Sequence, residues 1–440
     1  SCAYFLAIEG YSVTVFEKQP VLGGMLTLGI PSYRLEKDII NAEIDVLREL
    51  DVEFKTDVDV GNSITLAELR QQGFEAFYVA IGAQHGKSLG LEGEDAKGVM
   101  SGVDFLRQFA LGNSLNMRGK TVVIGGGNVA IDVARTAIRA ESNSVTMYCM
   151  ESRDKMPAHE EEVLEALDED VSIQNGWAPK RIITHNNKVT GVEFQKCLSV
   201  WDAQGQFNPQ FDSTVSMTIK ADHVLLSVGQ AIDWGMLLDQ SDVELNANHT
   251  AKAHQLTFQT AEKDIFVGGD ALTGPRFAID AIAQGKEGAI SIHRFVQHGQ
   301  SLELGRLKRH YTSFDKGRVK YHGYDNTPRQ RPVSVDGKVS KQTFRDLRAT
   351  LSEEQVIKEA ERCLGCGVVH SDTFMCVGCG ACTTKCKFGA ISIVKAFDAE
   401  GSELKDARKK IIKYAIKRKI RVTMKKPIKK IRRLLSSSVP

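Results

Sequence analysis

The apolar residues of the chain fall into short runs separated by amphipathic stretches, which is the pattern of alternating strands and helices. Runs of four or five residues rich in β-branched and aromatic side chains predict buried strands at 12–16, 77–81, 121–124 and 144–148. Apolar residues at helical spacing predict helices at 3–10, 37–50, 128–140 and 279–293. We therefore expect an α/β protein with mostly parallel strands.

Other stretches are less regular. Period-two alternation predicts a hairpin from 189–196 and 215–220, and a strand pair is expected at 52–60. The segment from 307 to 350 is polar and weakly periodic, which predicts a linker over the surface. A short helix at 353–362 follows this linker.

Length and composition fit a globular protein of about three domains. The 440 residues are 42% hydrophobic and 25% charged, which argues against a disordered or fibrous chain. No apolar run approaches the roughly 18 residues of a membrane span. Because no signal peptide is apparent either, we expect a cytoplasmic protein.

Charge is distributed unevenly. Residues 401–440 hold fifteen Lys or Arg and two acids, an excess of 13 positive charges. Because the whole chain sums to +2, the first 400 residues carry about −11. Isoleucines 411, 412, 416 and 420 predict an amphipathic helix in this tail. This tail could dock an acidic partner or a membrane surface, or it could be only a solvated tail. The acidic charge of the first 400 residues argues against binding of nucleic acid.

A glycine turn stands between the strand at 121–124 and the helix at 128–140. Its pattern is Gly125-x-Gly127-x-x-Ala130, with Asn128 as the first helical residue. Such a turn lets the backbone approach a pyrophosphate, which the N-terminus of the helix then stabilises. We therefore expect a Rossmann-type dinucleotide site here, in preference to a mere packing turn.

The nucleotide that this site prefers is indicated by the acid after the next strand. Glu151 could accept hydrogen bonds from the adenosine ribose and repel a 2′-phosphate. Arg153 could compensate for that repulsion, and both residues could be ordinary loop charges. The sequence favours NADH over NADPH.

Strand-end acids and glycine turns also occur before and after this dinucleotide unit in the sequence. Glu17 and its neighbour Lys18 close the strand at 12–16, Gly23-Gly24 forms a second turn, and Gly269-Asp270 ends a late buried strand. Together, around an inserted nucleotide domain, they predict FAD. Further candidate contacts lie at strand ends or on the helix that follows: Gly82, Gly229 and Ala281.

Six of the nine cysteines are concentrated within 24 residues: Cys363, Cys366, Cys376, Cys379, Cys382 and Cys386. The last four have the C-x2-C-x2-C-x3-C spacing of a 4Fe–4S cluster, for which structural zinc is the alternative. Six thiolates are too few for two cubane clusters, so a second cluster would need another ligand, such as His370 or Asp372. We expect one cluster and consider two possible.

Residues 23–37, Gly-Gly-Met-Leu-Thr-Leu-Gly-Ile-Pro-Ser-Tyr-Arg-Leu-Glu-Lys, resemble the flavin-domain signature of the glutamate synthase small-subunit family. The segment 80–83, the Gly125 turn, Met156-Pro157 and Gly269-Asp270 match that family in the same order. The resemblance covers about residues 1–300. It implies FAD in an outer domain, a nicotinamide dinucleotide in an inserted one, and Arg34 of the signature as a cofactor contact.

Two positions depart from the family pattern. NADPH-using members resemble Tyr-Arg-Arg where this chain has Met150 and Glu151 after Cys149, which strengthens the prediction of NADH. The first glycine turn is also absent, because the chain begins inside the helix that should follow it. We expect either sequence upstream of Ser1 or another chain to complete that unit.

These features predict two Rossmann-like domains, the second inserted in the first, and a small iron–sulfur domain. The expected boundaries are FAD-binding 1–115 and 256–306, NAD(P)-binding 116–255, linker 307–350, iron–sulfur 351–400 and basic tail 401–440. Because Cys2, Cys149 and Cys197 are isolated, no redox disulfide is available. The predicted function is electron transfer between NADH, or NADPH, and iron–sulfur clusters through FAD, in a complex with a partner subunit or ferredoxin.

No side-chain acid or base is needed for this transfer, so we predict no catalytic residue of that kind. A non-catalytic subunit, with a degenerate flavin fold that carries only the cluster, is the competing hypothesis. The missing glycine turn is its one support.

Overall fold

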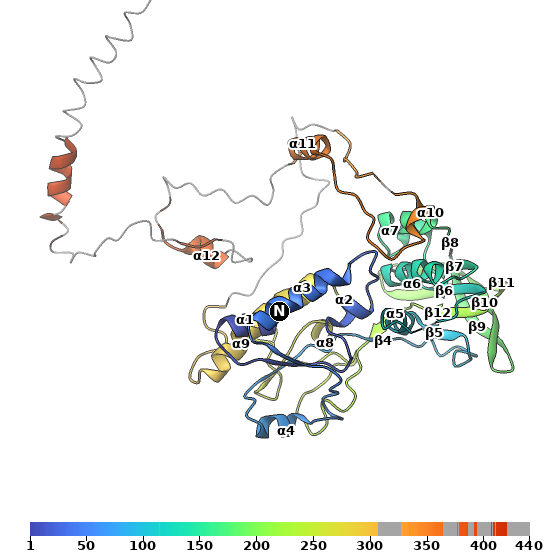
Figure 1. Cartoon of the computed structure of the whole chain (residues 1–440), viewed down its shortest axis with the longest axis horizontal. Coiled ribbons are helices and arrows are strands. Elements are labelled where there is room, and N and C mark those ends of the chain that lie inside the picture. The colour runs from blue at the N-terminus through green and yellow to red at the C-terminus, as the bar shows by residue number, and fades with distance from the viewer. Residues whose placement is uncertain are drawn as a thin grey trace, which may run out of the picture. The chain divides into compact units, whose positions relative to one another are not determined.

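The computed structural model describes residues 1–113, 115–306, 327–333, 335–363, 376, 378–385, 391–393, 406, 408–409 and 411–419 (Figure 1). Two compact units divide the chain: one combines Ser1–Lys308 with Ser313–Leu364, and the other combines Arg309–Thr312 with Gly365–Pro440. The first unit contains both of the predicted Rossmann-like domains.

The inserted domain is built on a five-stranded parallel sheet of order β5-β12-β6-β7-β8. Its strands are β5 (Val99–Ser101), β6 (Lys120–Ile124), β7 (Ser144–Cys149), β8 (Ser172–Asn175) and β12 (His223–Leu226). Its helices are α5 (Gly102–Ala110), α6 (Asn128–Arg139) and α7 (Glu160–Asp168), with a 3-10 turn, η1 (Arg153–Lys155), after β7. The central strands β6 and β12 are buried along nearly their whole length, because both faces of the sheet are covered there.

A three-stranded antiparallel sheet, in the order β11-β10-β9, packs against this domain (Figure 1). It comprises β9 (Trp177–His185), β10 (Lys188–Trp201) and β11 (Phe207–Lys220), which confirms the predicted hairpin with longer strands. Phe194 of β10 stacks on Tyr148 of β7 with ring centroids 4.2 Å apart, so the two sheets share one apolar core.

The outer domain contains two short parallel pairs. β1 (Thr14–Phe16) pairs with β2 (Glu53–Lys55), and β3 (Phe77–Val79) pairs with β14 (Ile265–Val267). The helices α1 (Cys2–Ile8) and α9 (Ala278–Val296) lie side by side (Figure 1). The other helices are α2 (Gly24–Leu28), α3 (Lys37–Glu49), α4 (Leu66–Gln71) and α8 (Asp270–Thr273).

The chain crosses between the two domains at adjacent points. β4 (His85–Gly86) leads out of the outer domain and pairs antiparallel with β13 (Gln230–Ala231), which leads back. The Lys87 N–H also donates to the Gly229 carbonyl at 3.1 Å. This pairing shows that one domain is inserted into the other, as the predicted fold requires. The crossing lies at 85–87 and 229–231, however, and not at the predicted boundaries 115/116 and 255/256, because β5 already pairs with β12 of the inserted sheet.

One expected element is wrong. The strand pair at 52–60 is reduced to β2, and Val60 makes only an isolated bridge with Ile64. The backbone reverses here, because Asp57 has φ +58° and the Asn62 N–H donates to the Asp59 carbonyl.

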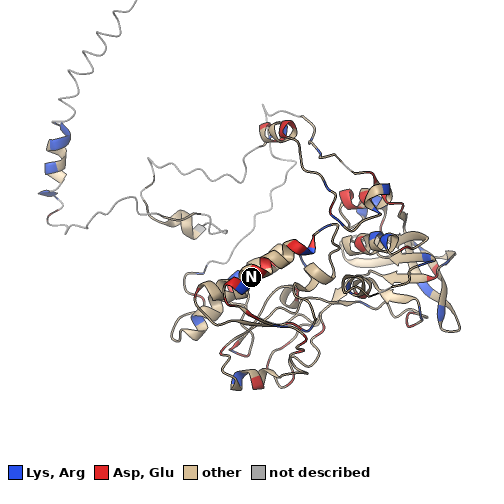
Figure 2. Cartoon of the chain, in the orientation of Figure 1, with Lys and Arg blue, Asp and Glu red and all other residues tan. Residues whose placement is uncertain are grey.

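The described part of the C-terminal sequence is helical in places. α10 (Gly337–Ser340) and α11 (Glu353–Glu361) belong to the first unit, and α12 (Ala381–Lys385) to the second. Residues 411–419 are helical, as predicted, and Figure 2 shows their Lys and Arg residues in blue. Ile411, Ile412 and Ile416 are all at least half exposed, and Ile420 lies outside the described residues. None of the described helices has the length and hydropathy of a membrane span.

Candidate dinucleotide and iron–sulfur sites

The glycine turn after β6 packs tightly against the neighbouring strand end. Gly125 has φ +145°, and a Cβ at that position would lie 2.3 Å from the Ser227 carbonyl oxygen and 3.3 Å from the Ala130 Cβ. Only glycine fits this backbone without strain. The third position of the motif is fully buried Ala130, which lets α6 approach the turn.

The start of α6, by contrast, is open. Gly127 is its N-cap residue, and a Cβ there would meet no atom within 4 Å. No side chain caps this helix and no acid lies in its first turn. The first backbone N–H groups are therefore available to a phosphate, so the turn fits the pyrophosphate of a dinucleotide.

Glu151 lies beside this turn, where the sequence predicts the ribose-binding acid. A Cβ at Gly126 would be 2.9 Å from Glu151 Oε2, so the carboxylate lies against the glycine backbone. The Glu151 carbonyl accepts hydrogen bonds from Asn175 Nδ2 at 3.1 Å and from the Gly176 N–H at 3.2 Å. These bonds fix the acid at the end of β7.

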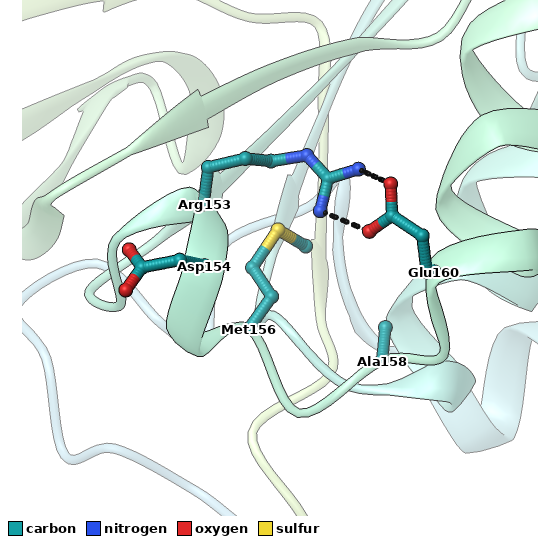
Figure 3. Close-up of a pocket in the computed structure, with 5 residues that line it drawn as sticks. All are labelled: Arg153, Asp154, Met156, Ala158 and Glu160. Atoms are coloured by element: carbon teal, nitrogen blue, oxygen red, sulfur yellow. Dashed lines mark hydrogen bonds and ion pairs between the residues drawn. The ribbon is translucent and has the colours of Figure 1, made fainter.

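Arg153 forms an ion pair with Glu160, a partner that the sequence did not predict. Its Nη1 and Nη2 donate to the two carboxylate oxygens of Glu160, at 2.8 and 2.7 Å (Figure 3). Both residues line a pocket with Asp154, Met156 and Ala158. The Ala158 N–H donates to the Gly126 carbonyl at 3.1 Å, so this pocket adjoins the glycine turn.

In the outer domain, Asp270 stands where β3 and β14 both end. Its Oδ1 accepts the Arg276 N–H at 3.1 Å, and burial raises the pKa of this carboxyl group. Gly269, with φ +66°, precedes it and comes close to Ala281, since a Cβ at Gly269 would lie 3.6 Å from the Ala281 Cβ. Gly82 follows β3 at the same edge of the strands.

Glu17 ends β1 and is half buried. Its Oε1 accepts the Gln19 N–H at 2.9 Å, and burial raises the pKa of the carboxyl group. Lys18 instead forms a surface ion pair with Asp59 at 3.0 Å. Gly23 and Gly24 begin α2, and a Cβ at Gly24 would meet no atom within 4 Å. The acid, the open turn and Asp270 are chemically suited to the ribose, phosphate and ribityl groups of FAD.

Arg34 lies between the two domains. Its Nε donates to Asp132 of α6 and its Nη1 to Glu162 of α7, while its Nη2 is buried without a hydrogen-bond partner. Burial raises the pKa of Asp132 to about 7, and the nearby Glu162 adds to this while Arg34 opposes it. The predicted cofactor contact of Arg34 stays a prediction, and its observed partners are carboxylates of the inserted domain.

Three of the predicted cluster ligands, Cys376, Cys379 and Cys382, are exposed in the second unit, the last of them on α12. None of the three forms a disulfide. Cys363 follows α11 in the first unit and is also exposed. Their spacing suits cluster ligation, but the described residues include no group of three or more Cys, His, Asp or Glu side chains gathered closely enough to hold a metal ion. Cys366, Cys386, His370 and Asp372 lie outside the described residues.

The remaining cysteines are of a different kind. Cys2, Cys149 and Cys197 are buried and unpaired. Burial raises the pKa of both Cys2 and Cys149 to about 12. Buried thiols with a raised pKa are unreactive near neutral pH.

Comparison with known proteins bears on the same two regions. Residues 1–285 match the family "Pyridine nucleotide-disulphide oxidoreductase", and residues 369–392 match the "4Fe-4S binding domain". The chain belongs to the first of these families. The predicted NAD(P)H- and FAD-dependent oxidoreductase with a 4Fe–4S motif is therefore confirmed at the level of the family.

Several proteins of known name are similar to this chain in sequence. The NADPH-Fe(3+) oxidoreductase subunit beta of Geobacter sulfurreducens is 32% identical, with 83% of this chain and 59% of that protein covered. The NADP(+)-dependent formate dehydrogenase subunit beta of Moorella thermoacetica is 33% identical, with 83% and 52% covered. The glutamate synthase (NADPH) small chain of Escherichia coli is 30% identical, with 68% and 66% covered, which confirms the resemblance. The chain thus spans between half and two thirds of these relatives' lengths.

Two solved structures share the fold of the first unit. FprA from Mycobacterium tuberculosis superposes with a TM-score of 0.58 at 18% identity, over 67% of this chain and 82% of that one. The thioredoxin reductase of T. acidophilum gives a TM-score of 0.51 at 20% identity, over 67% and 93%. These likenesses confirm the pair of Rossmann-like domains.

Proposed function

We propose that this family member carries electrons from NADH through FAD to a 4Fe–4S cluster at its C-terminal cysteines, and from there to a partner subunit. The single observation that supports this most is the combination, in one chain, of the open glycine turn at α6 and the C-x2-C-x2-C spacing of exposed thiols. A flavin supplies the chemistry that converts a two-electron donor into single-electron steps.

The residues of the chain supply binding and orientation. The first turn of α6 would bind the pyrophosphate of the dinucleotide, and Glu151 its adenosine ribose. Glu17 and Asp270 would bind the corresponding groups of FAD. Cys376, Cys379, Cys382 and Cys386 would hold the cluster. The two-electron donor NADH and the one-electron acceptor would thus react at separate parts of the chain.

The experiment that tests this proposal is an anaerobic NADH titration of the purified full chain, followed by visible absorption. We expect the flavin band and the broader cluster absorption to bleach together. Cluster absorption without a flavin band, unchanged by NADH, would instead establish the non-catalytic scaffold. Bound zinc without visible absorption would contradict the cluster.

The preference for NADH rests on Glu151 and on the pairing of Arg153 with Glu160. Replacing Glu151 by Ala should narrow the NADH-over-NADPH ratio of kcat/KM about tenfold, which corresponds to about 1.4 kcal/mol. Adding Glu160→Gln should narrow it further, because Arg153 would be freed to meet a 2′-phosphate. Steady-state kinetics with both nucleotides measure the ratio.

The matched control is Glu161→Gln, which removes one charge from the adjacent position of α7. It should leave the ratio unchanged. The test is needed because the relatives named above carry NADPH or NADP(+) in their names, whereas NADH is proposed for this chain. A ratio unaltered by Glu151→Ala would remove the assigned role of that residue.

We further propose that the basic tail docks an acidic surface of the partner subunit. Its helix at 411–419 exposes both basic side chains and isoleucines, which suits a partner that is acidic and partly apolar. Deleting residues 405–440 should leave NADH–dye activity intact and weaken partner binding at least tenfold in a pull-down titration. Unchanged binding would show that the tail is only solvated, and lost binding to anionic vesicles instead would show a membrane role.

A further inference from the structure

A buried cluster of charges lies away from the glycine turn, where α6 and α7 meet. Glu169, at the end of α7, is 1% exposed and accepts four hydrogen bonds from two arginines of α6. Arg135 donates through Nε and Nη2 at 2.9 and 2.7 Å, and Arg139 through Nη1 and Nη2 at 2.6 and 2.8 Å. The dinucleotide chemistry described above makes no use of this cluster.

The cluster stays charged across the neutral range. Burial alone would raise the pKa of Glu169, but the hydrogen bonds from Arg139 and Arg135 outweigh burial and hold the pKa at about 2. Arg135 also pairs with Glu165 through Nη1, so two carboxylates balance the two guanidinium groups. A buried ion pair is weak evidence for added stability, so we ask which arrangement of the chain this cluster fixes.

The outer domain supplies the aromatic ring that faces these two guanidinium groups. The ring of Tyr33 lies 4.6 Å from Arg135 Cζ and 4.2 Å from Arg139 Cζ, a double cation–π contact. The Tyr33 hydroxyl donates to the Asp132 carbonyl of α6 at 3.2 Å. Tyr33 belongs to the signature at 23–37, so that motif joins the outer domain to α6.

A segment from the far C-terminal side closes over the same charges. Arg139 donates through Nε to the Thr343 carbonyl and through Nη2 to the Ser340 carbonyl, both at 2.8 Å. The Ser340 hydroxyl donates to Glu169 at 3.2 Å. Phe344 stacks on Phe109 of α5, with ring centroids 4.7 Å apart.

The other end of this segment is bonded to the outer domain. Arg348 Nη2 donates to the Arg34 carbonyl at 2.6 Å, and the Asp346 N–H donates to Glu36 Oε1 at 3.3 Å. Phe344 also lies 6.2 Å from the ring of Tyr33. Residues 336–348 therefore contact both domains, and we call this segment the strap.

We propose that the strap clamps the inserted domain to the outer domain, with Phe344 and Arg348 as positioning residues for hydride transfer. This inference rests on the proposed function. The β4–β13 crossing alone is a short two-stranded connection, so the domain orientation needs further contacts. Reacting atoms must lie about 3 to 3.5 Å apart for efficient transfer, so a loosened orientation costs rate rather than nucleotide affinity.

The test is the double variant Phe344→Ala/Arg348→Ala in the full chain, which removes strap contacts and leaves the buried ion cluster in place. We expect the rate of flavin reduction at saturating NADH, measured by anaerobic stopped flow, to fall about tenfold or more. The NADH dissociation constant should stay within about twofold, because the glycine turn is untouched. The matched control is Lys338→Ala/Gln342→Ala, which truncates two exposed side chains of the same strap.

A second measurement needs no activity. Hydrogen exchange of the Arg34 and Leu35 amides, which donate to the Pro31 carbonyl, should accelerate in the double variant and not in the control. Equal exchange and equal reduction rates in the two variants would overturn the clamp. If the unaltered chain is not reduced by NADH, the proposed function fails, and the exchange measurement still decides whether the strap restrains the outer domain.

Discussion

Gly125→Ala is expected to lower NADH-dependent flavin reduction about 100-fold, because it displaces the glycine turn from the nucleotide. The new Cβ would lie 2.3 Å from the Ser227 carbonyl oxygen, and the backbone φ of +145° is strained for any other residue. Either the turn or β12 must shift, and α6 moves with the turn. Anaerobic stopped-flow absorption at saturating NADH measures the rate.

Gly112→Ala is the matched control for this prediction. Gly112 lies in the same domain with φ +78°, but a Cβ there would meet no atom within 4 Å. An alanine at Gly112 has the same kind of backbone strain but no steric collision. Such strain lowers stability by about 1 to 2 kcal/mol and leaves the nucleotide site undisturbed. The rate of flavin reduction in this variant should therefore stay within about threefold of the unaltered chain. Comparable rates for both variants would show that the turn does not hold the dinucleotide.

Cys379→Ser is expected to remove the cluster and separate the two halves of the electron path. The variant should lose at least about tenfold of its bound iron and its broad visible absorption, because serine is a poor ligand for iron–sulfur clusters. Flavin reduction by NADH should be retained, while single-electron transfer to a partner or ferredoxin should be lost. Iron and sulfide analysis with single-turnover kinetics measures these outcomes.

Thr384→Ser is the control, since Thr384 is exposed on α12, which begins two residues after Cys379, and is not a thiol. It should keep both cluster and electron transfer. Loss of bound zinc from the Cys379 variant, with no change in visible absorption, would assign these cysteines to a structural metal instead.

The parts of this protein that the sequence determined by itself are those fixed by local physical chemistry. The strands β6 and β7 are mostly apolar because both faces of their sheet are covered, so the sequence alone predicts them. The Gly125 turn was predictable because one backbone conformation requires glycine. The cysteine spacing likewise reflects the geometry of one short loop around a metal cluster.

Tertiary structure decided the partners of the charged residues. Arg153 looks free in the sequence, and its pairing with Glu160 depends on how η1 meets α7. Arg34 finds Asp132 and Glu162 about a hundred residues away, across a domain boundary. The only sign of this ion pair in the sequence is that Asp132 is a single acid within the mostly apolar face of α6, and this does not indicate which residue pairs with it.

The strap shows why such contacts escape sequence reasoning. Its polar composition predicts only a linker over the surface, yet it closes over the most deeply buried charges described here. It binds Arg139 mainly through the carbonyl groups of Ser340 and Thr343. Every residue type carries a carbonyl group, so such bonds leave no mark on composition or periodicity, and only the folded chain reveals them.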